Sequence, residues 1–135
     1  MMPKFSNQSS NILMQAHPDL CRLMNEAIQY VDFKVMCSFR GEAEQNDAYH
    51  SGASNLQWPI SLHNERPSRA VDIVPWHDNE PHIRYSDTQA FYLLAGVVLG
   101  IAKMRGIDIR WGGTWHQEII YARPSFIDLP HWELA

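Results

Sequence analysis

The stretch Ala70-Val71-Asp72-Ile73-Val74 is a short apolar run that carries a single charge at its centre. Its β-branched residues favour an extended strand, and a run of this length is typical of a strand buried on both faces. A carboxylate in such a strand loses its hydration at a large cost in free energy unless a cation compensates it. The run therefore predicts both a central strand and a cation beside Asp72.

The residues around this strand show helical and extended patterns in turn. Helical spacing or a helix-forming composition marks three segments, at residues 18–31, 40–52 and 87–105. Further strands are expected at residues 33–39, 107–111 and 130–134, with loops at residues 54–69 and 76–85 and a loose lead-in at residues 1–10. Because helices and strands do not strictly alternate, the predicted fold class is α+β, with a small antiparallel sheet flanked by helices.

The bulk composition narrows the possible functions. A chain of 135 residues is large enough for one domain with a hydrophobic core that needs no disulfides, and Cys21 and Cys37 are expected to be reduced. The net charge of −4 disfavours nucleic acid and anionic membranes as partners. The longest apolar stretch, residues 93–102, is roughly half of a membrane span, and the N-terminus has no signal-peptide pattern. We therefore expect synthesis in the cytoplasm without a membrane segment.

Candidate metal ligands are split between the middle and the end of the sequence. His63 and Asp72 flank a loop, and His131 lies in the last predicted strand. Two imidazoles and a carboxylate can hold zinc and leave its fourth position open to water, as a hydrolase requires. Asp128, three residues before His131, is a candidate base. A single histidine is more often a surface residue than a ligand, so this prediction depends on the combination.

Three motifs occur in order along the chain: Ser61-x-His63, Pro67-Ser68-x-Ala70-Val71-Asp72-Ile73 and Asp128-x-Pro130-His131-Trp132-Glu133. This set resembles the signatures of the M15 zinc peptidases, which include D-Ala-D-Ala carboxypeptidases and dipeptidases, and phage endolysins that cut the L-Ala–D-Glu bond of peptidoglycan. Supporting matches are Ser38-Phe39-Arg40, Glu44-Gln45, Gly52-x-Ser54 and Trp111-Gly112-Gly113. The resemblance spans about residues 17–134. It implies a hedgehog/DD-peptidase-like fold and one zinc peptidase catalytic domain over residues 1–135.

The resemblance also implies roles for individual residues. The zinc ligands would be His63, Asp72 and His131, and Asp128 would be the catalytic acid and base. Arg40 would bind a substrate carbonyl or carboxylate and stabilise charge in the transition state, although a solvated arginine at a strand end is an equal alternative.

Other residues of the motifs have less defined roles. Gln45 and Ser61 are candidate substrate-binding residues; the alternatives are a helix cap for Gln45 and a contact to the ligand shell for Ser61. Glu133 is either a support for His131 or a surface acid. Three histidines lie outside these motifs and are not predicted as ligands: His77, His82 and His116.

The sequence thus predicts a monomeric zinc peptidase that acts as an endolysin on the stem peptides of peptidoglycan, most specifically at the L-Ala–D-Glu bond. One rival is a D-Ala-D-Ala carboxypeptidase, and another is a non-catalytic zinc-binding module like the hedgehog relatives of this fold. Asp128 favours an enzyme, because a binding module needs no acid beside the open metal position. Since no signal peptide is visible, a separate export or lysis factor is expected to bring the protein to the wall.

Overall fold

A computed structural model describes residues 2–114 and 127–135. Within these residues the chain forms four α-helices, one 3₁₀ turn and four strands. In chain order they are α1 (Asn7–Leu13), α2 (Pro18–Ala27), β1 (Phe33–Cys37), α3 (Glu42–Ser51), η1 (Leu62–Asn64), β2 (Ala70–Pro75), α4 (Thr88–Arg105), β3 (Ile109–Trp111) and β4 (His131–Leu134). None of the helices in the described residues has the length and hydrophobicity of a membrane span.

The four strands form one antiparallel sheet in the order β1-β2-β4-β3. Asp72 lies directly opposite His131 on the neighbouring strand, and Arg110 lies opposite Glu133. Because side chains alternate between the faces of a strand, these four residues point to one face of the sheet. The predicted α+β class with a small antiparallel sheet is confirmed.

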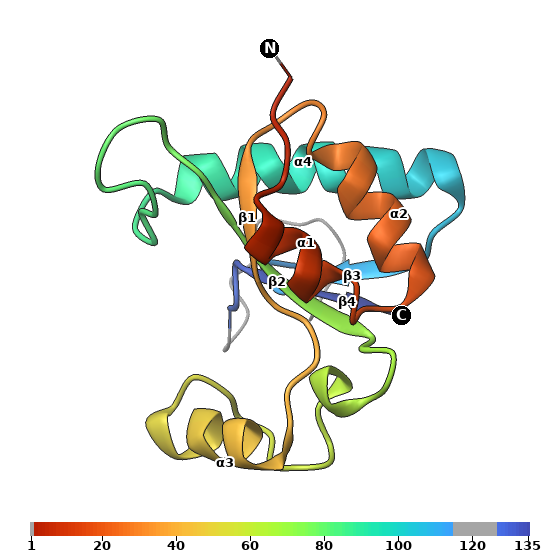
Figure 1. The fold of residues 1–135 in the computed structure, drawn as a ribbon, viewed down its shortest axis with the longest axis vertical. Coiled ribbons are helices and arrows are strands. Elements are labelled where there is room, and N and C mark those ends of the chain that lie inside the picture. The colour runs from red at the N-terminus through yellow and green to blue at the C-terminus, as the bar shows by residue number, and fades with distance from the viewer. Residues whose placement is uncertain (1, 115–126) are drawn as a thin grey trace.

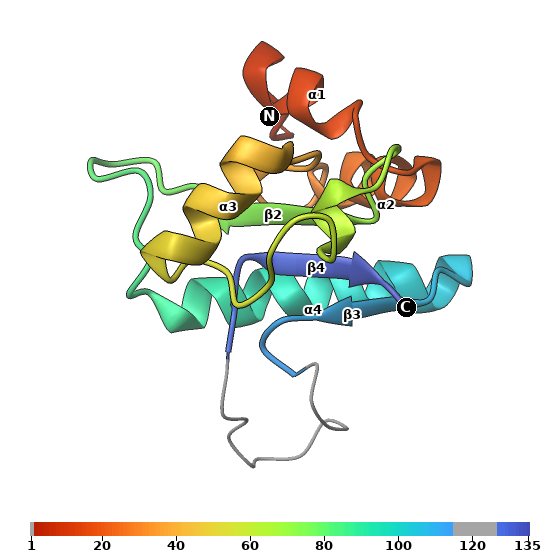
Figure 2. The ribbon, with the colours of Figure 1, turned by 90° about the horizontal axis from the view of Figure 1, so that it is seen from below.

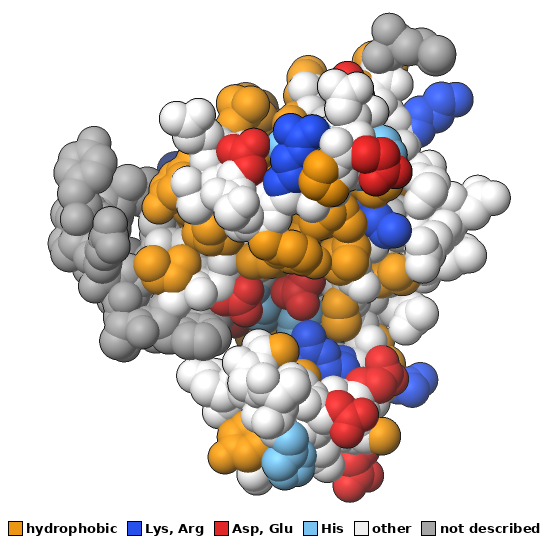
Figure 3. Space-filling view, turned by 90° about the vertical axis from the view of Figure 1, so that its left-hand side faces the viewer, with side chains coloured by type: hydrophobic (Ala, Val, Ile, Leu, Met, Phe, Trp, Pro, Cys, Tyr) orange, Lys and Arg blue, Asp and Glu red, His pale blue; other side chains and the backbone are white. Residues whose placement is uncertain are grey.

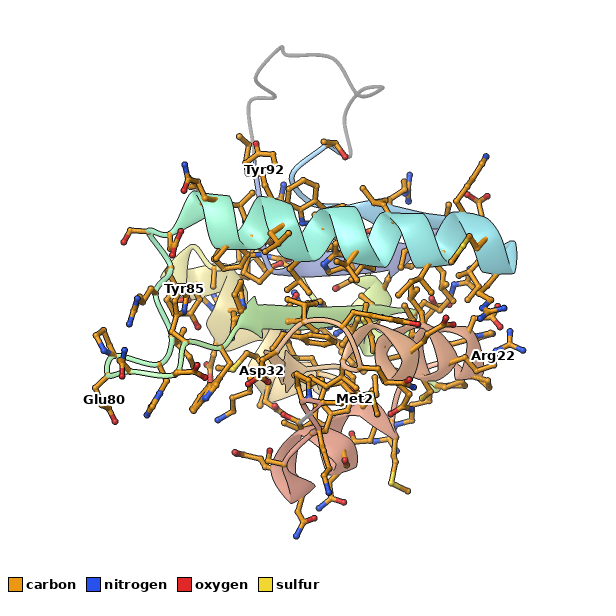
Figure 4. All side chains as sticks on the ribbon, turned by 90° about the horizontal axis from the view of Figure 1, so that it is seen from above. Met2, Arg22, Asp32, Glu80, Tyr85 and Tyr92 are labelled. Carbon is orange, nitrogen blue, oxygen red and sulfur yellow. The ribbon has the colours of Figure 1, made fainter. Side chains whose placement is uncertain are left out.

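The other face of the sheet is covered by α4. Asp87 caps this helix by accepting a hydrogen bond from the backbone of Ala90, and Gly106 ends it with a φ of 68°. Its buried side chains recur at helical spacing, at Phe91, Leu94, Ala95, Val98, Ile101 and Ala102. They belong to the same hydrophobic core as Val71, Ile73 and Trp132 of the sheet. Figure 4 shows α4 running along the sheet.

The elements form layers around this core. Helix α2 packs against α4, and α1 packs against β1, one of the two edge strands of the sheet (Figure 1). Helix α3 lies on the opposite side of the sheet from α4, as two perpendicular views show (Figures 1 and 2). The face that carries Asp72 and His131 is therefore turned toward α3 and the segment that follows it.

The prediction of a loose lead-in at residues 1–10 is wrong for residues 7–10, which begin α1. Ser6 caps this helix, and the buried hydroxyl of Ser9 accepts a hydrogen bond of 3.1 Å from the backbone of Val35. Ser9 thus satisfies a backbone N–H of β1, an edge strand with no second neighbouring strand among the described residues. The predicted irregular loop at residues 54–69 also contains one short element, η1.

Candidate metal centre

Three side chains from distant parts of the sequence converge on the open face of the sheet. The Nε2 atom of His63 lies 3.3 Å from Nδ1 of His131 and 3.3 Å from Oδ1 of Asp72. The distance from Nδ1 of His131 to Oδ1 of Asp72 is also 3.3 Å. The three atoms therefore form an equilateral triangle, and they belong to the three residues that the sequence predicts as ligands.

This triangle has the dimensions of one face of a zinc coordination tetrahedron. Ligand atoms at about 2.0–2.1 Å from a tetrahedral zinc ion lie about 3.3–3.4 Å from one another. Two imidazole nitrogens and one carboxylate oxygen are also a donor set that catalytic zinc uses, with the fourth position left for water. The residues present thus fit a catalytic zinc ion in both chemistry and spacing.

The position of His63 is fixed by the short turn η1. Ser61 caps the turn, with its hydroxyl accepting a hydrogen bond of 3.2 Å from the backbone of His63. On the ring, Nδ1 of His63 lies 2.7 Å from the carbonyl oxygen of Ser38. Because a carbonyl only accepts, Nδ1 must carry a proton, and Nε2 is the nitrogen that a metal would bind in place of its proton.

His131 is oriented in the same way by Glu133. Its Nε2 atom lies 2.8 Å from Oε1 of Glu133, two residues along the same face of β4. The carboxylate accepts the proton of Nε2, and Nδ1 faces Asp72 and His63. The second oxygen of Glu133 lies 2.5 Å from Nη2 of Arg110 on β3. Of the two readings that the sequence leaves open for Glu133, the geometry matches support for a ligand.

A thiol also lies near the site. The Sγ atom of Cys37 lies close enough to His63 and Asp72 for these three residues to form a possible metal cluster. However, Cys37 lies 3.9 Å from Nδ1 of His63, the nitrogen that faces Ser38 and not the triangle. The triangle of His63, Asp72 and His131 is therefore the better zinc site.

The charged groups of the site change each other's pKa values. Burial opposes a positive charge on His63, but the hydrogen bond and negative charge of Asp72 outweigh it and raise the pKa of His63 to about 10. Burial alone would raise the pKa of Asp72, but hydrogen bonds from His131 and His63 hold it well below its usual range. Zinc competes with these protons for the ring nitrogens, so zinc affinity falls as the pH falls.

Asp128 lies just before β4, in the turn that leads to His131. Its backbone carbonyl accepts a hydrogen bond of 3.1 Å from His131, and its backbone N–H donates to Gly112 at 3.0 Å. Because Asp128 precedes the strand, the alternation of β4 does not turn it away from the site. Burial raises the pKa of Asp128, and the nearby charge of Asp72 raises it further. A carboxyl group with a raised pKa is suited to move protons near neutral pH.

Arg40 lies beside the triangle, and the buried Gln45 side chain holds it in place. Its Nη2 atom lies 3.4 Å from Oδ2 of Asp72, and Nη1 donates to the Gln45 side chain at 3.0 Å. Gln45 is fully buried and also bonds to Asn64, to Ser54 and to the carbonyl of Leu56.

These residues surround a cleft of about 410 Å³ between the sheet and the segment after α3. Of the predicted site residues, His63, Asp72, His131, Asp128, Arg40 and Ser61 line it. Acidic and histidine side chains gather at its floor, and hydrophobic side chains border it (Figure 3). Met36, Leu56, Ile60 and Tyr85 are exposed apolar residues of this border.

The family model described as phage L-alanyl-D-glutamate peptidase matches residues 1–135. The chain belongs to this family. The peptidase is thus a hydrolase of peptidoglycan, and the resemblance seen in the sequence is confirmed. The structure of the chain is also similar to the crystal structure of the Serratia marcescens L-Ala D-Glu endopeptidase ChiX, with a TM-score of 0.79. The two sequences are 27% identical, and the match covers 99% of this chain and 91% of that chain. Comparison with curated protein sequences gave no significant match.

The sequence did not single out Arg110, which contacts Glu133 in the cleft of the peptidase. The only available signal was one charged residue between the apolar Ile109 and Trp111. Outside the cleft, Nε2 of His77 lies 2.9 Å from Oδ2 of Asp87. His116 lies outside the described residues.

Proposed function

We propose that this peptidase is a zinc-dependent endolysin that cleaves the L-Ala–D-Glu bond of peptidoglycan stem peptides. His63, Asp72 and His131 would hold the zinc ion, and the observation that carries the proposal is the triangle of ligand atoms 3.3 Å apart. All three ligands come from one chain, which supports action as a monomer. A separate export or lysis factor would bring the enzyme to the wall.

Zinc bound at the triangle would lower the pKa of a water molecule and polarise the scissile carbonyl. Asp128 then has two tasks that its position and raised pKa support. As a base it accepts a proton from the attacking water, and as an acid it delivers that proton to the nitrogen of the leaving D-Glu. The products are a carboxylate at L-Ala and a free amine at D-Glu.

Arg40 supplies positive charge beside the ligands. Only 16% of its side chain is exposed, and Asp72 and Gln45 fix its guanidinium on two sides. A fixed cation at this place stabilises the negative charge that develops on the substrate carbonyl in the transition state. Because Gln45 is fully buried, we propose that it positions Arg40 and makes no contact with the substrate. Ser61 lines the cleft, where its hydroxyl caps the turn of His63 and can also donate to the substrate.

The test of this function is mass spectrometry of purified peptidoglycan after digestion, with and without a chelator, on protein of measured zinc content. We expect chelator-sensitive release of stem peptides that begin with D-Glu. Loss of terminal D-Ala alone would instead identify a carboxypeptidase. Zinc bound at one equivalent without any cleavage would identify a binding module, and both results would contradict the proposal.

A close backbone contact positions Asp128 and gives a further prediction. A Cβ atom at Gly112 would lie 1.9 Å from the carbonyl oxygen of Asp128, so Gly112→Ala must displace Asp128. Since a shift of about 1 Å in a catalytic group can cost ~100-fold in rate, we expect kcat to fall by about that factor while zinc content is retained. The matched control is Gly96→Ala in α4, where the added Cβ meets nothing within 4 Å. Full activity of Gly112→Ala would contradict the placement of Asp128.

A further inference from the structure

Two cations line the cleft within the described residues, Arg40 and Arg110, and they are available to a substrate to different degrees. The Arg40 side chain is 16% exposed and both of its terminal nitrogens have protein partners. The Arg110 side chain is 53% exposed, and its one hydrogen-bonded partner among the described residues is Glu133, through Nη2. Most of the hydrogen-bond donors of Arg110 can therefore reach a ligand in the cleft.

Arg110 lies on the wall of the cleft where the leaving group of the scissile bond would bind. Asp128 marks the leaving-group side, because it delivers a proton to the departing nitrogen. The backbone of Asp128 is bonded to Gly112, two residues after Arg110 on the same chain segment. Gly112 in turn donates to the carbonyl of His131 at 2.8 Å. Arg110 and Asp128 thus belong to the same wall of the cleft, formed by β3 and the start of β4.

The leaving group, D-Glu, carries an anion that Arg110 could bind. In the stem peptide, D-Glu is linked onward through its γ-carboxyl group, so its α-carboxylate is free. That carboxylate is attached to the carbon that bears the scissile nitrogen. A substrate that places this nitrogen at Asp128 therefore brings an anion to the wall that carries Arg110. A guanidinium can bind a carboxylate through two parallel hydrogen bonds.

We infer that Arg110 forms a subsite for the free α-carboxylate of the residue on the leaving-group side. This inference rests on the proposed function, because it assigns D-Glu to that side. Glu133 orients the guanidinium by holding Nη2 at 2.5 Å. If a divalent zinc ion is bound, the two arginines and the carboxylates of Asp72, Asp128 and Glu133 would leave the cleft with a net positive charge, which would favour an anionic substrate.

The test compares two peptides and two enzymes. One peptide is N-acetylated L-Ala–γ-D-Glu–L-Lys, and the other carries a carboxamide in place of the α-carboxylate of D-Glu. We expect wild-type kcat/KM to favour the carboxylate peptide by about 10- to 100-fold, the range for a hydrogen bond to a charged group. In Arg110→Gln this ratio should fall to about 1, whatever the absolute rates. The ratio is insensitive to general damage to the fold or to zinc content.

The matched control is Arg105→Gln. Arg105 is also an exposed arginine paired with a glutamate, Glu26, but it lies outside the cleft. It should keep the wild-type ratio. A ratio of about 1 in the wild-type enzyme, or a wild-type ratio in Arg110→Gln, would overturn the subsite and leave the proposed function intact. A zinc-loaded wild-type enzyme that cleaves neither peptide would contradict both.

Discussion

Replacing His63 with alanine is expected to abolish zinc binding and peptidase activity together. The variant removes one corner of the triangle and leaves two ligands, which do not complete a catalytic zinc site. We expect zinc affinity to fall by more than the roughly 10- to 100-fold typical of losing an outer partner. Activity should fall at least ~1,000-fold, equivalent to about 4 kcal/mol of transition-state stabilisation. Zinc content by elemental analysis and the rate on a stem peptide measure the two effects.

The control for this variant is His77→Ala. His77 is also partly buried and paired with an aspartate, but it lies outside the cleft. It should keep zinc and activity even if its own pairing contributes to stability. Circular dichroism distinguishes loss of zinc from loss of the fold. A folded His63→Ala protein that still binds one equivalent of zinc tightly would refute the ligand role.

The central part of this site could be predicted from local sequence signals. A single carboxylate in the run of residues 70–74 already required a cation, and the structure places two histidines around it. Helix α4 could also be predicted, because Asp87 and Gly106 mark its ends and the apolar residues between them recur at helical spacing. In both cases the signal is local, because it depends on residues within a few positions of one another.

The rest depends on contacts that no local pattern encodes. Arg110 and Glu133 meet only because β3 and β4 pair in one register, and a shift by one residue would point them to opposite faces. The Gln45 amide holds three parts of the chain together: Arg40 after β1, Ser54 after α3, and Asn64 at the end of η1. Helix α1 was missed because polar serines usually indicate a loop, whereas here Ser9 bonds to β1.

Replacing Asp128 with asparagine is expected to separate catalysis from metal binding. The amide has nearly the same shape, so the backbone contacts to Gly112 and His131 should remain. It cannot accept the proton of the attacking water, and it cannot deliver one to the leaving nitrogen. General acid–base catalysis contributes about 100- to 10,000-fold, so we expect kcat to fall by a factor in that range while zinc content stays at the wild-type level. The measurement pairs kcat on a stem peptide with elemental analysis of the same sample.

The control for the change of charge is Asp108→Asn, because Asp108 is an exposed acid just before β3 that does not line the cleft. Both substitutions remove one negative charge, so a general electrostatic effect would change both variants alike. Burial and the charge of Asp72 raise the pKa of Asp128, which lines the cleft. Loss of kcat in Asp128→Asn alone therefore assigns the proton transfers to this side chain. Equal activity of the two variants would move that role to another group.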